Sequence, residues 1–540
     1  MDPVARERSA AQAALAQGEW STARTRFARI PDPGVSDLDG LAVACWWLGL
    51  VDEFIDASER LHDAHAADGA PARAGRAAVE IAYMEILRGN EGTGMGWFAR
   101  ARRLLEADRN APERGYLLVL DGAGAVEARE WEAADALSAE LLELASTHGD
   151  PTLQALGLFG SGESAVHQGK VTDGLRALDE AMLLVLDGRV APSWAGNLYC
   201  RMMQMCSDLG DLPRARYWTD ITERWQAGYA PAVIFRGICR VHRVELLQVE
   251  GQWDRAAREA ATAAEELDGI DLQVAAEAHY RLGEIHRLRG ELDAAEASYR
   301  RAHRAGRDPL PGLALVHLDR GRCHVAASVL DAALATAATA AERAPLLAAR
   351  TEVALATAEA VDTETAESAV TELEQLARDH HSPAWRADAH RWRGTAHLAA
   401  GRTAEAVTEL REARHEWQRM GAPYLVARIR LDLARALARL GDSDSADRER
   451  QAAAESLSRL GARRDLARVG SPGAGEDRVL SAREVEVLAA IADGSTNRDA
   501  SGRLHISERT VARHLANVYR KVGAASRTGA VAWARERGLL

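Results

Sequence analysis

Residues 480–538 read LSAREVEVLAAIADGSTNRDASGRLHISERTVARHLANVYRKVGAASRTGAVAWARERG, with a start or stop signal at every expected helix end. Ser481 precedes Glu484 by three residues, which is the spacing of a capping box. Hydroxyl side chains favour helix N-termini, and glycine favours the left-handed backbone that ends a helix. Such residues recur at short intervals: Ser481, Gly494, Thr496, Ser507, Gly523 and Ser526. The stretch therefore predicts four short helices.

The third of these helices, between Ser507 and Gly523, has two distinct faces at 100° per residue. Its apolar side is predicted to pack on Val485, Leu488, Ile491 and Leu504. The members of that side are Val511, Leu515, Val518 and Val522, and opposite them lie Arg509, Arg513, Ala516 and Arg520. Two helices joined by a short turn, the second of them basic, form the helix-turn-helix layout.

The arginine side of this helix is suited to the major groove of double-stranded DNA, because a guanidinium can donate to guanine O6 and N7 together. A helix N-terminus with hydroxyl side chains also binds a backbone phosphate. The bland alternative is a solvated charged face, and His514, at the border of the apolar side, fits packing or a phosphate contact better than base reading. The predicted DNA-binding residues are Ser507, Arg509, Thr510, Arg513, His514, Asn517, Arg520 and Lys521.

This stretch resembles the DNA-binding domain of LuxR-type transcription regulators. The resemblance rests on Leu480, Arg483, Glu484, Val487, Leu488, Gly494, Asn497, Leu504, Ile506, Ser507, Thr510, Val511, His514, Gly523, Arg527 and Gly538–Leu540. It implies transcription regulation through double-stranded DNA and a homodimer paired through the fourth helix, where Val531 and Trp533 exceed the needs of so small a core. Val531, Trp533 and Arg535 are the predicted dimer interface.

The stretch departs from that family's pattern at three sites, which comprise four residues. Ala512 and Ala516 stand where basic residues are usual, and Ala500-Ser501 replaces an Ile-Ala pair in the preceding helix. The contact set would then shift to Arg509, Arg513, Asn517 and Arg520. A second hypothesis follows, in which the chain is a protein-interaction scaffold with a weakened DNA-binding domain.

The rest of the chain repeats a pattern of glycine followed five residues later by a small residue. It appears at Gly18, Gly169, Gly210, Gly251, Gly290, Gly321, Gly401 and Gly441, and more weakly near Gly49, Gly89, Glu130 and Val361. Most spacings are 39–41 residues, which is typical of a helical solenoid. About twelve helical hairpins would stack, because no single repeat can bury its own apolar face.

Residues 276–309 show the chemistry of one repeat unit. Tyr280, Leu282 and Ile285 are predicted to form the apolar stripe of its first helix, and Gly283 to admit a neighbouring helix. Ala295, Tyr299 and Ala302 would form the second stripe. The unit resembles the tetratricopeptide repeat (TPR). The groove of such an array is expected to bind a protein, peptide or small-molecule effector, and the residues that bind it are unknown.

Tryptophans divide into two predicted groups. Trp20, Trp131 and Trp253 follow their repeat's turn by two residues and are core by periodicity. Trp46, Trp47, Trp218 and Trp225 are candidates to line a groove, because adjacent helix positions cannot both face the core.

Charge and composition divide the chain into an all-α array over residues 1–468, a linker over 469–476 and a DNA-binding domain over 477–540. The linker holds three glycines, a proline and a serine, which do not sustain a helix. Residues 477–540 carry a net charge of +4, whereas the preceding residues carry −17. A basic module on an acidic body is typical of one nucleic-acid-binding domain.

Several function classes are not supported. The chain lacks a phosphate loop and a strand–helix alternation, so neither an ATPase nor any other enzyme is predicted, and we expect no catalytic residues, cofactor or metal. Five cysteines without a CxxC pair indicate buried thiols in a reducing compartment. The N-terminus has no apolar signal segment and no run spans a membrane, so the expected location is cytoplasmic.

Overall fold

The computed structural model describes residues 3–227, 233–356, 362–469, 482–492, 494–504, 506–522, 524, 526–536, 539 and 540. These residues form two compact units, Met1–Leu466 and Ala467–Leu540. Every regular element in the described ranges is a helix, which confirms the all-α prediction.

The first unit is a succession of helices of eight to eighteen residues. They are α1 (Pro3–Ala16), α2 (Trp20–Phe27), α3 (Val35–Leu48), α4 (Val51–Ala67), α5 (Pro71–Leu87), α6 (Glu91–Leu105), α7 (Arg114–Glu127), α8 (Trp131–His148), α9 (Pro151–His167), α10 (Val171–Leu186), α11 (Pro192–Asp208), α12 (Leu212–Gln226), α13 (Val233–Val249), α14 (Trp253–Glu266), α15 (Leu272–Arg289), α16 (Leu292–Arg304), α17 (Gly312–Asp319), α18 (Cys323–Thr336), α19 (Ala340–Ala356), α20 (Thr363–Asp379), α21 (Pro383–Ala399), α22 (Thr403–Arg419), α23 (Pro423–Arg439) and α24 (Ser443–Leu460).

These helices pair in chain order, so α1–α24 make twelve hairpins, as the repeat period predicts. Each of the eight turn glycines of the repeat pattern has a positive φ, between 61° and 83°. Gly49 and Gly89 also have positive φ values, 70° and 87°. In the fourth hairpin the turn residue is Arg129 (φ 62°), one position before the predicted Glu130. Val361 lies outside the described residues. The small residues five positions after the turn glycines are buried.

The hairpin of α15 and α16 shows why a small residue is needed at the crossing. A Cβ added to Gly283 would lie 2.8 Å from Cδ1 of Tyr299, so only glycine admits that ring. Tyr299, Ala295 and Ala302 are fully buried, as predicted. Leu282 is only half-buried, so its assignment to the apolar stripe is wrong. Tyr280, Gly283 and Ile285 are the buried residues in this part of the helix.

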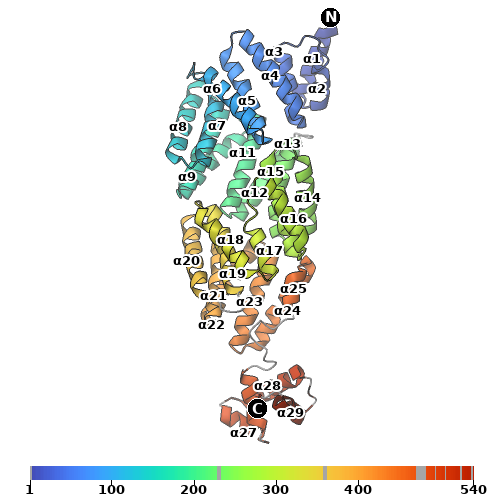
Figure 1. Cartoon of the computed structure of the whole chain (residues 1–540), viewed down its shortest axis with the longest axis vertical. Coiled ribbons are helices and arrows are strands. Elements are labelled where there is room, and N and C mark those ends of the chain that lie inside the picture. Colours follow the sequence, from blue (N-terminus) through green and yellow to red (C-terminus); the bar gives the residue numbers. More distant parts are fainter. Residues whose placement is uncertain are drawn as a thin grey trace. The chain divides into compact units, whose positions relative to one another are not determined.

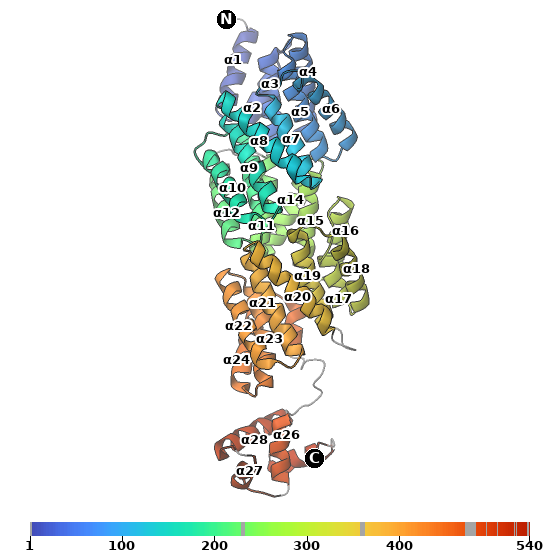
Figure 2. The ribbon, with the colours of Figure 1, turned by 90° about the vertical axis from the view of Figure 1, so that its left-hand side faces the viewer.

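Neighbouring hairpins stack where the second helix of one packs on the first helix of the next, as α4 does on α5 and α8 on α9, and their first helices also touch. Contacts join α5 to α7 and α7 to α9, and the same spacing recurs from α11 through α23. The views in Figures 1 and 2 show this succession of hairpins, coloured from blue to orange. Because each hairpin contacts mainly its neighbours, the array is a solenoid.

The observed burial of the tryptophans differs from the predicted division into core and groove residues. Trp20 and Trp253 are buried as predicted, whereas Trp131 is half-buried and stacks on His167. Trp47 and Trp218, proposed to line a groove, are core residues with 4% exposure each, so that prediction is wrong. Trp47 stacks on Trp20 with ring centroids 5.0 Å apart, which the spacing of single repeats does not reveal.

The five cysteines are free thiols, four of them buried. Within the described ranges, no helix is long and apolar enough to cross a membrane. No group of three His, Cys, Asp or Glu side chains in the same ranges is arranged to hold a metal ion.

The second unit contains the helices of the predicted DNA-binding domain. They are α26 (Ala482–Ala492), α27 (Asn497–Leu504), α28 (Glu508–Val522) and α29 (Arg527–Glu536). The helix before them, α25 (Arg463–Val469), includes the first residue of the predicted linker, so Val469 is helical. The remaining linker residues, 470–476, lie outside the described residues, as do Leu480 and Ser481.

Candidate nucleic-acid interface and array cavity

A small apolar core positions the exposed face of α28. Val511, Leu515 and Val518 are each at most 4% exposed, which confirms the predicted apolar side. They form one cluster with Val487, Leu488, Ile491, Ala500, Ala530 and Ala534, and Val485, Leu504 and Val522 pack partly against it. Burying this side of α28 leaves its opposite side to solvent.

Local hydrogen bonds set where the helices begin. Thr496 Oγ1 accepts the N–H of Asp499 at 3.2 Å, and Asp499 Oδ2 accepts the N–H of Thr496 at 2.9 Å, which is a complete capping box before α27. Ser507 Oγ accepts the N–H of Thr510 at 3.1 Å before α28. Ser526 Oγ accepts the N–H of Gly529 at 3.1 Å before α29. These three predicted caps are confirmed.

The outward face of α28 carries Arg509, Arg513 and Arg520, all of them exposed. Arg520 Nη2 donates to Asn517 Oδ1 at 3.1 Å, so two predicted base-reading side chains already lie against each other. Ala512 and Ala516 are also exposed on this helix. The structure thus places the three arginines on one exposed face of the helix, and a fork-shaped guanidinium suits an acceptor-rich surface.

The N-terminus of α28 offers backbone N–H groups and two hydroxyls. Ser507 and Thr510 lie with their hydroxyl oxygens 2.7 Å apart. Because Ser507 Oγ also accepts a helix N–H, its cap role and a phosphate contact would share one oxygen. His514 is half-buried, in accord with its predicted place at the border of the apolar side. The side chain of Lys521, along with His505 and Gly523, lies outside the described residues.

Arg527 has a structural role that the sequence did not reveal. Its guanidinium donates to the carbonyl oxygens of Ser495 and, at 3.3 Å, of Ile491. It therefore fastens the start of α29 to the end of α26. The sequence motif contains this arginine but does not indicate that its hydrogen-bond partners are main-chain carbonyl groups.

The predicted dimer residues lie on α29 in two settings. Val531 and Trp533 are half-buried and pack partly against the domain's own core. The domain's own core therefore covers part of these two side chains and leaves part of each exposed. Arg535 is exposed. Pairing through α29 stays a prediction.

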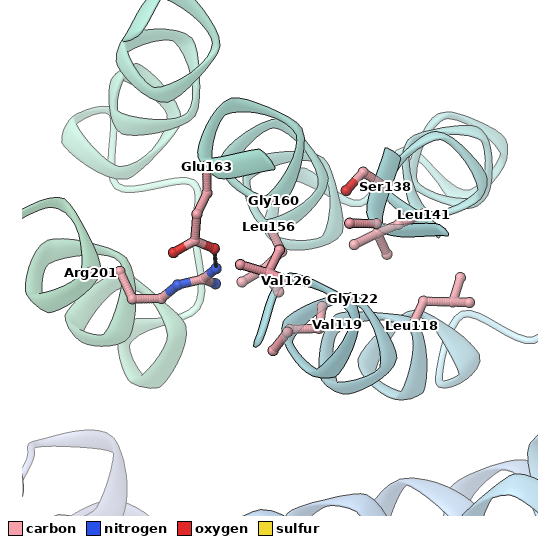
Figure 3. A pocket seen from close by; sticks show the side chains of 12 residues that line it. Leu118, Val119, Gly122, Val126, Ser138, Leu141, Leu156, Gly160, Glu163 and Arg201 are labelled. Carbon is pink, nitrogen blue, oxygen red and sulfur yellow. Dashed lines mark hydrogen bonds and ion pairs between the residues drawn. The ribbon is translucent and has the colours of Figure 1, made fainter. Parts of the chain in front are cut away.

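The array contains a small cavity between α7, α8, α9 and α11. Figure 3 shows Glu163 and Arg201 meeting at one side of it, and most of the other lining residues are aliphatic, with the hydroxyl of Ser138 among them. It encloses about 20 Å³, which is room for a single water molecule. This cavity is therefore too small for an organic effector.

A carboxylate cluster lies beside this ion pair, on the first helices of the hairpins. Arg281 on α15 contacts Glu245 on α13 at 3.3 Å and Glu277 on its own helix at 2.7 Å. Asp208 on α11 instead accepts from the Gln204 amide, also at 2.7 Å. Burial raises the pKa of Asp208 to about 7, with a further contribution from Glu245, Glu163 and Glu277.

We expect Asp208→Asn to raise the free energy of unfolding of the array at pH 8 by about 1–3 kcal/mol. A carboxyl with a raised folded pKa is still protonated when the unfolded chain is ionised. It therefore lowers stability as pH rises from its ordinary pKa of 3.8 to about 7. Urea unfolding at pH 5 and pH 8 measures this. The exposed Asp220→Asn on α12 is the control, and equal pH slopes for wild type and Asp208→Asn would contradict the assignment.

The family model described as "Bacterial regulatory proteins, luxR family" matches residues 478–534. Over 61 residues the chain is 39% identical to the CsgBAC operon transcriptional regulatory protein of Escherichia coli (strain K12), covering 11% of this chain and 28% of that protein. It is 46% identical over 61 residues to the transcriptional regulatory protein YdfI of Bacillus subtilis (strain 168), covering 11% and 29%. It is 51% identical over 53 residues to the probable transcriptional regulatory protein SgaR of Hyphomicrobium methylovorum, covering 10% and 25%. The matched segment spans about a quarter of the length of these relatives.

Solved structures resemble the helical array loosely. A Rap protein complexed with competence and sporulation factor is 12% identical, with a TM-score of 0.37, covering 73% of this chain and 99% of that chain. The apo form of the quorum sensor NprR from B. thuringiensis is 12% identical with a TM-score of 0.33, covering 70% and 97%. The solenoid assignment rests on the helix contacts described above.

Proposed function

We propose that this chain, which ends in a DNA-binding domain of the LuxR family, is a sequence-specific transcription regulator that binds double-stranded DNA. The observation that carries the proposal is the outward face of α28, where Arg509, Arg513 and Arg520 are exposed above a buried apolar side. In a helix-turn-helix the second helix enters the major groove with such a face.

Within that function, each predicted site residue has a chemical role. Ser507, Thr510 and the first N–H groups of α28 bind a backbone phosphate, because a helix N-terminus attracts anions. Arg513 lies one turn further along and reads a base edge, together with Asn517 and Arg520. Arg509, His514 and Lys521 contact the backbone near that site.

A homodimer is part of the proposal, because a single helix-turn-helix contacts few base pairs and two copies read half-sites about one helical turn apart. Val531, Trp533 and Arg535 on α29 are the proposed pairing residues. Their half-buried or exposed positions leave surface for a second copy. The DNA site would then be palindromic.

The array is proposed to bind an effector, either a protein, a peptide or a small molecule. The alternative function is that of a protein-interaction scaffold with a weakened DNA-binding domain. One observation favours it: Ala512 and Ala516 are exposed on α28 at positions where the family pattern has basic residues. The two functions differ in whether the full chain selects a DNA sequence.

Selection of duplexes from a random-sequence library by the full-length protein tests the proposal. We expect enrichment of a palindromic sequence and an affinity that falls as salt rises, because phosphate contacts release counterions. The reference is the Val518→Asp variant, whose DNA-binding unit is expected to be unfolded. If the wild type enriches no sequence more than this variant does, the scaffold function is the better explanation.

Arg513→Ala is expected to cost about 1–3 kcal/mol in binding the selected duplex, because a bidentate base contact is lost. Binding is measured by fluorescence anisotropy at fixed salt, and stoichiometry comes from the same titration. Arg459→Ala on α24 removes an equal charge from an exposed site in the array. If the two variants bind equally well, Arg513 does not read a base.

A further inference from the structure

The helix α25 (Arg463–Val469) crosses the boundary between the two units, and its first four residues, Arg463–Leu466, belong to the array. It has seven residues, too few to be stable alone in water, so tertiary contacts must hold it. Arg464 and Asp465, near its N-terminus, supply contacts of this kind.

Two consecutive residues of α25 contact a polar cluster that we call the socket. It consists of Asp319, Glu352, Tyr424 and Arg428. Arg464 forms ion pairs with Asp319 at the end of α17 and, at 3.9 Å, with Glu352 on α19. Asp465, which is 2% exposed, accepts from the Tyr424 hydroxyl at 2.7 Å. These contacts link α25 to residues far apart in the sequence.

The socket is closed by Arg428 on α23. Its Nη2 donates to Glu352 Oε1 at 2.5 Å, and its Nε lies 3.9 Å from Asp465 Oδ1. Burial would raise the pKa of Glu352, but Arg428, Arg464 and Arg391 outweigh burial and hold it well below its usual range. The carboxylate is therefore ionised and pairs with both arginines.

The main chain of α25 also lies close to an earlier hairpin. A Cβ added to the turn residue Gly290, between α15 and α16, would lie 3.4 Å from Cβ of Arg464. A Cβ on Gly251, in the preceding hairpin, would clash with Leu460 at the end of α24. The start of α25 thus touches the turn of one hairpin while its side chains reach three others.

The socket holds Arg464 incompletely. Within the described ranges, its Nε and Nη1 are buried without a hydrogen-bond partner. Buried unpaired donors cost free energy that exposure to water restores. The two unpaired donors of Arg464 therefore destabilise the docked position of α25, and undocking would expose them to water.

Asp319, Glu352 and Tyr424 come from three different hairpins, α17/α18, α19/α20 and α23/α24. Their spacing is set by how the hairpins stack, and a solenoid changes curvature by small rotations between neighbours. Ion pairs and hydrogen bonds have a narrow distance range. A modest change in stacking would therefore separate the groups that hold α25.

We infer that α25 is the output element of the array, docked through Arg464 and Asp465 in a socket that only one stacking of α17–α23 assembles. An effector that prefers another stacking releases α25, because a ligand shifts an equilibrium by its differential affinity for the two states. Release alters how the DNA-binding unit is attached to the array. This inference rests on the proposed function.

The test uses full-length protein and three variants. Arg464→Met removes the charged anchor, and Tyr424→Phe removes only the hydroxyl that Asp465 accepts. Arg463→Met is the matched control, because Arg463 is the adjacent, exposed arginine of the same helix. Hydrogen exchange is measured over residues 461–469, and affinity is measured on the selected duplex.

We expect exchange over 461–469 to rise at least tenfold in Arg464→Met and severalfold in Tyr424→Phe, and less than twofold in Arg463→Met. The half-saturating protein concentration on DNA should shift at least threefold in Arg464→Met only. Unchanged exchange in Arg464→Met, or a DNA affinity equal to that of Arg463→Met, overturns the inference. If the wild type selects no duplex, the proposed function is wrong, and so is the output role of α25. The hydrogen-exchange rates would still show whether the socket holds α25.

Discussion

Val518→Asp is expected to unfold the C-terminal unit while the array remains folded. Val518 has 0% exposure and lies in the apolar cluster that joins α26, α27, α28 and α29. An unpaired carboxylate there costs several kcal/mol, about the whole stability of so small a domain. Hydrogen exchange and thermal unfolding should show loss of protection in residues 482–536 alone, since the array is a separate compact unit.

Ala516→Asp is the matched control for this result. Ala516 is two residues away on the same helix and is exposed, so the same charge is introduced without burial. This control should fold and bind DNA weakly. A single cooperative melt that disappears entirely in Val518→Asp would show that the two units do not fold independently.

Trp253→Ala is expected to destabilise its part of the array by about 3–5 kcal/mol, the range for deleting a buried aromatic side chain. Trp253 is 2% exposed, donates from Nε1 to the Gln248 carbonyl at 3.0 Å and packs edge-on against Tyr424, with ring centroids 5.4 Å apart. The loss should appear as faster hydrogen exchange in α13–α16, because a solenoid loses stability locally.

Trp131→Ala is the paired comparison, because Trp131 has the same place in its own hairpin but is only half-buried. Its cost should be clearly smaller, measured by chemical denaturation under the same conditions. Equal costs would show that the place in the repeat, and not burial, decides how much each tryptophan contributes.

The helix starts and the inward face of α28 were predictable because their causes are local. A hydroxyl cap acts on a backbone N–H three residues away, and a helical face follows from a period of 3.6 residues. Thr496, Ser507 and Ser526 cap helices as predicted, and Val511, Leu515 and Val518 are buried. The turns at the repeat glycines were predictable for the same reason, because a positive φ is a local property of the chain.

The burial of several side chains was not predictable because it depends on contacts between helices. Trp47 and Trp218 are core residues because other helices cover them, and Trp20 from the preceding hairpin stacks on Trp47. Val531 and Trp533 pack on a core assembled from all four helices of their domain. A single helix shows which residues share a face, but it does not show how many neighbours will cover that face.

The sequence by itself determined the all-α class, the hairpin period and the basic face of α28, because each follows from the spacing of residues within one or two helices. Tertiary structure alone decided the anchoring role of Arg527, the raised pKa of Asp208 and the socket that holds α25. Glu352 and Arg428 are 76 residues apart and become partners only when the hairpins stack. Electrostatic contacts act through space, so the order of residues does not contain them until the fold supplies their distances.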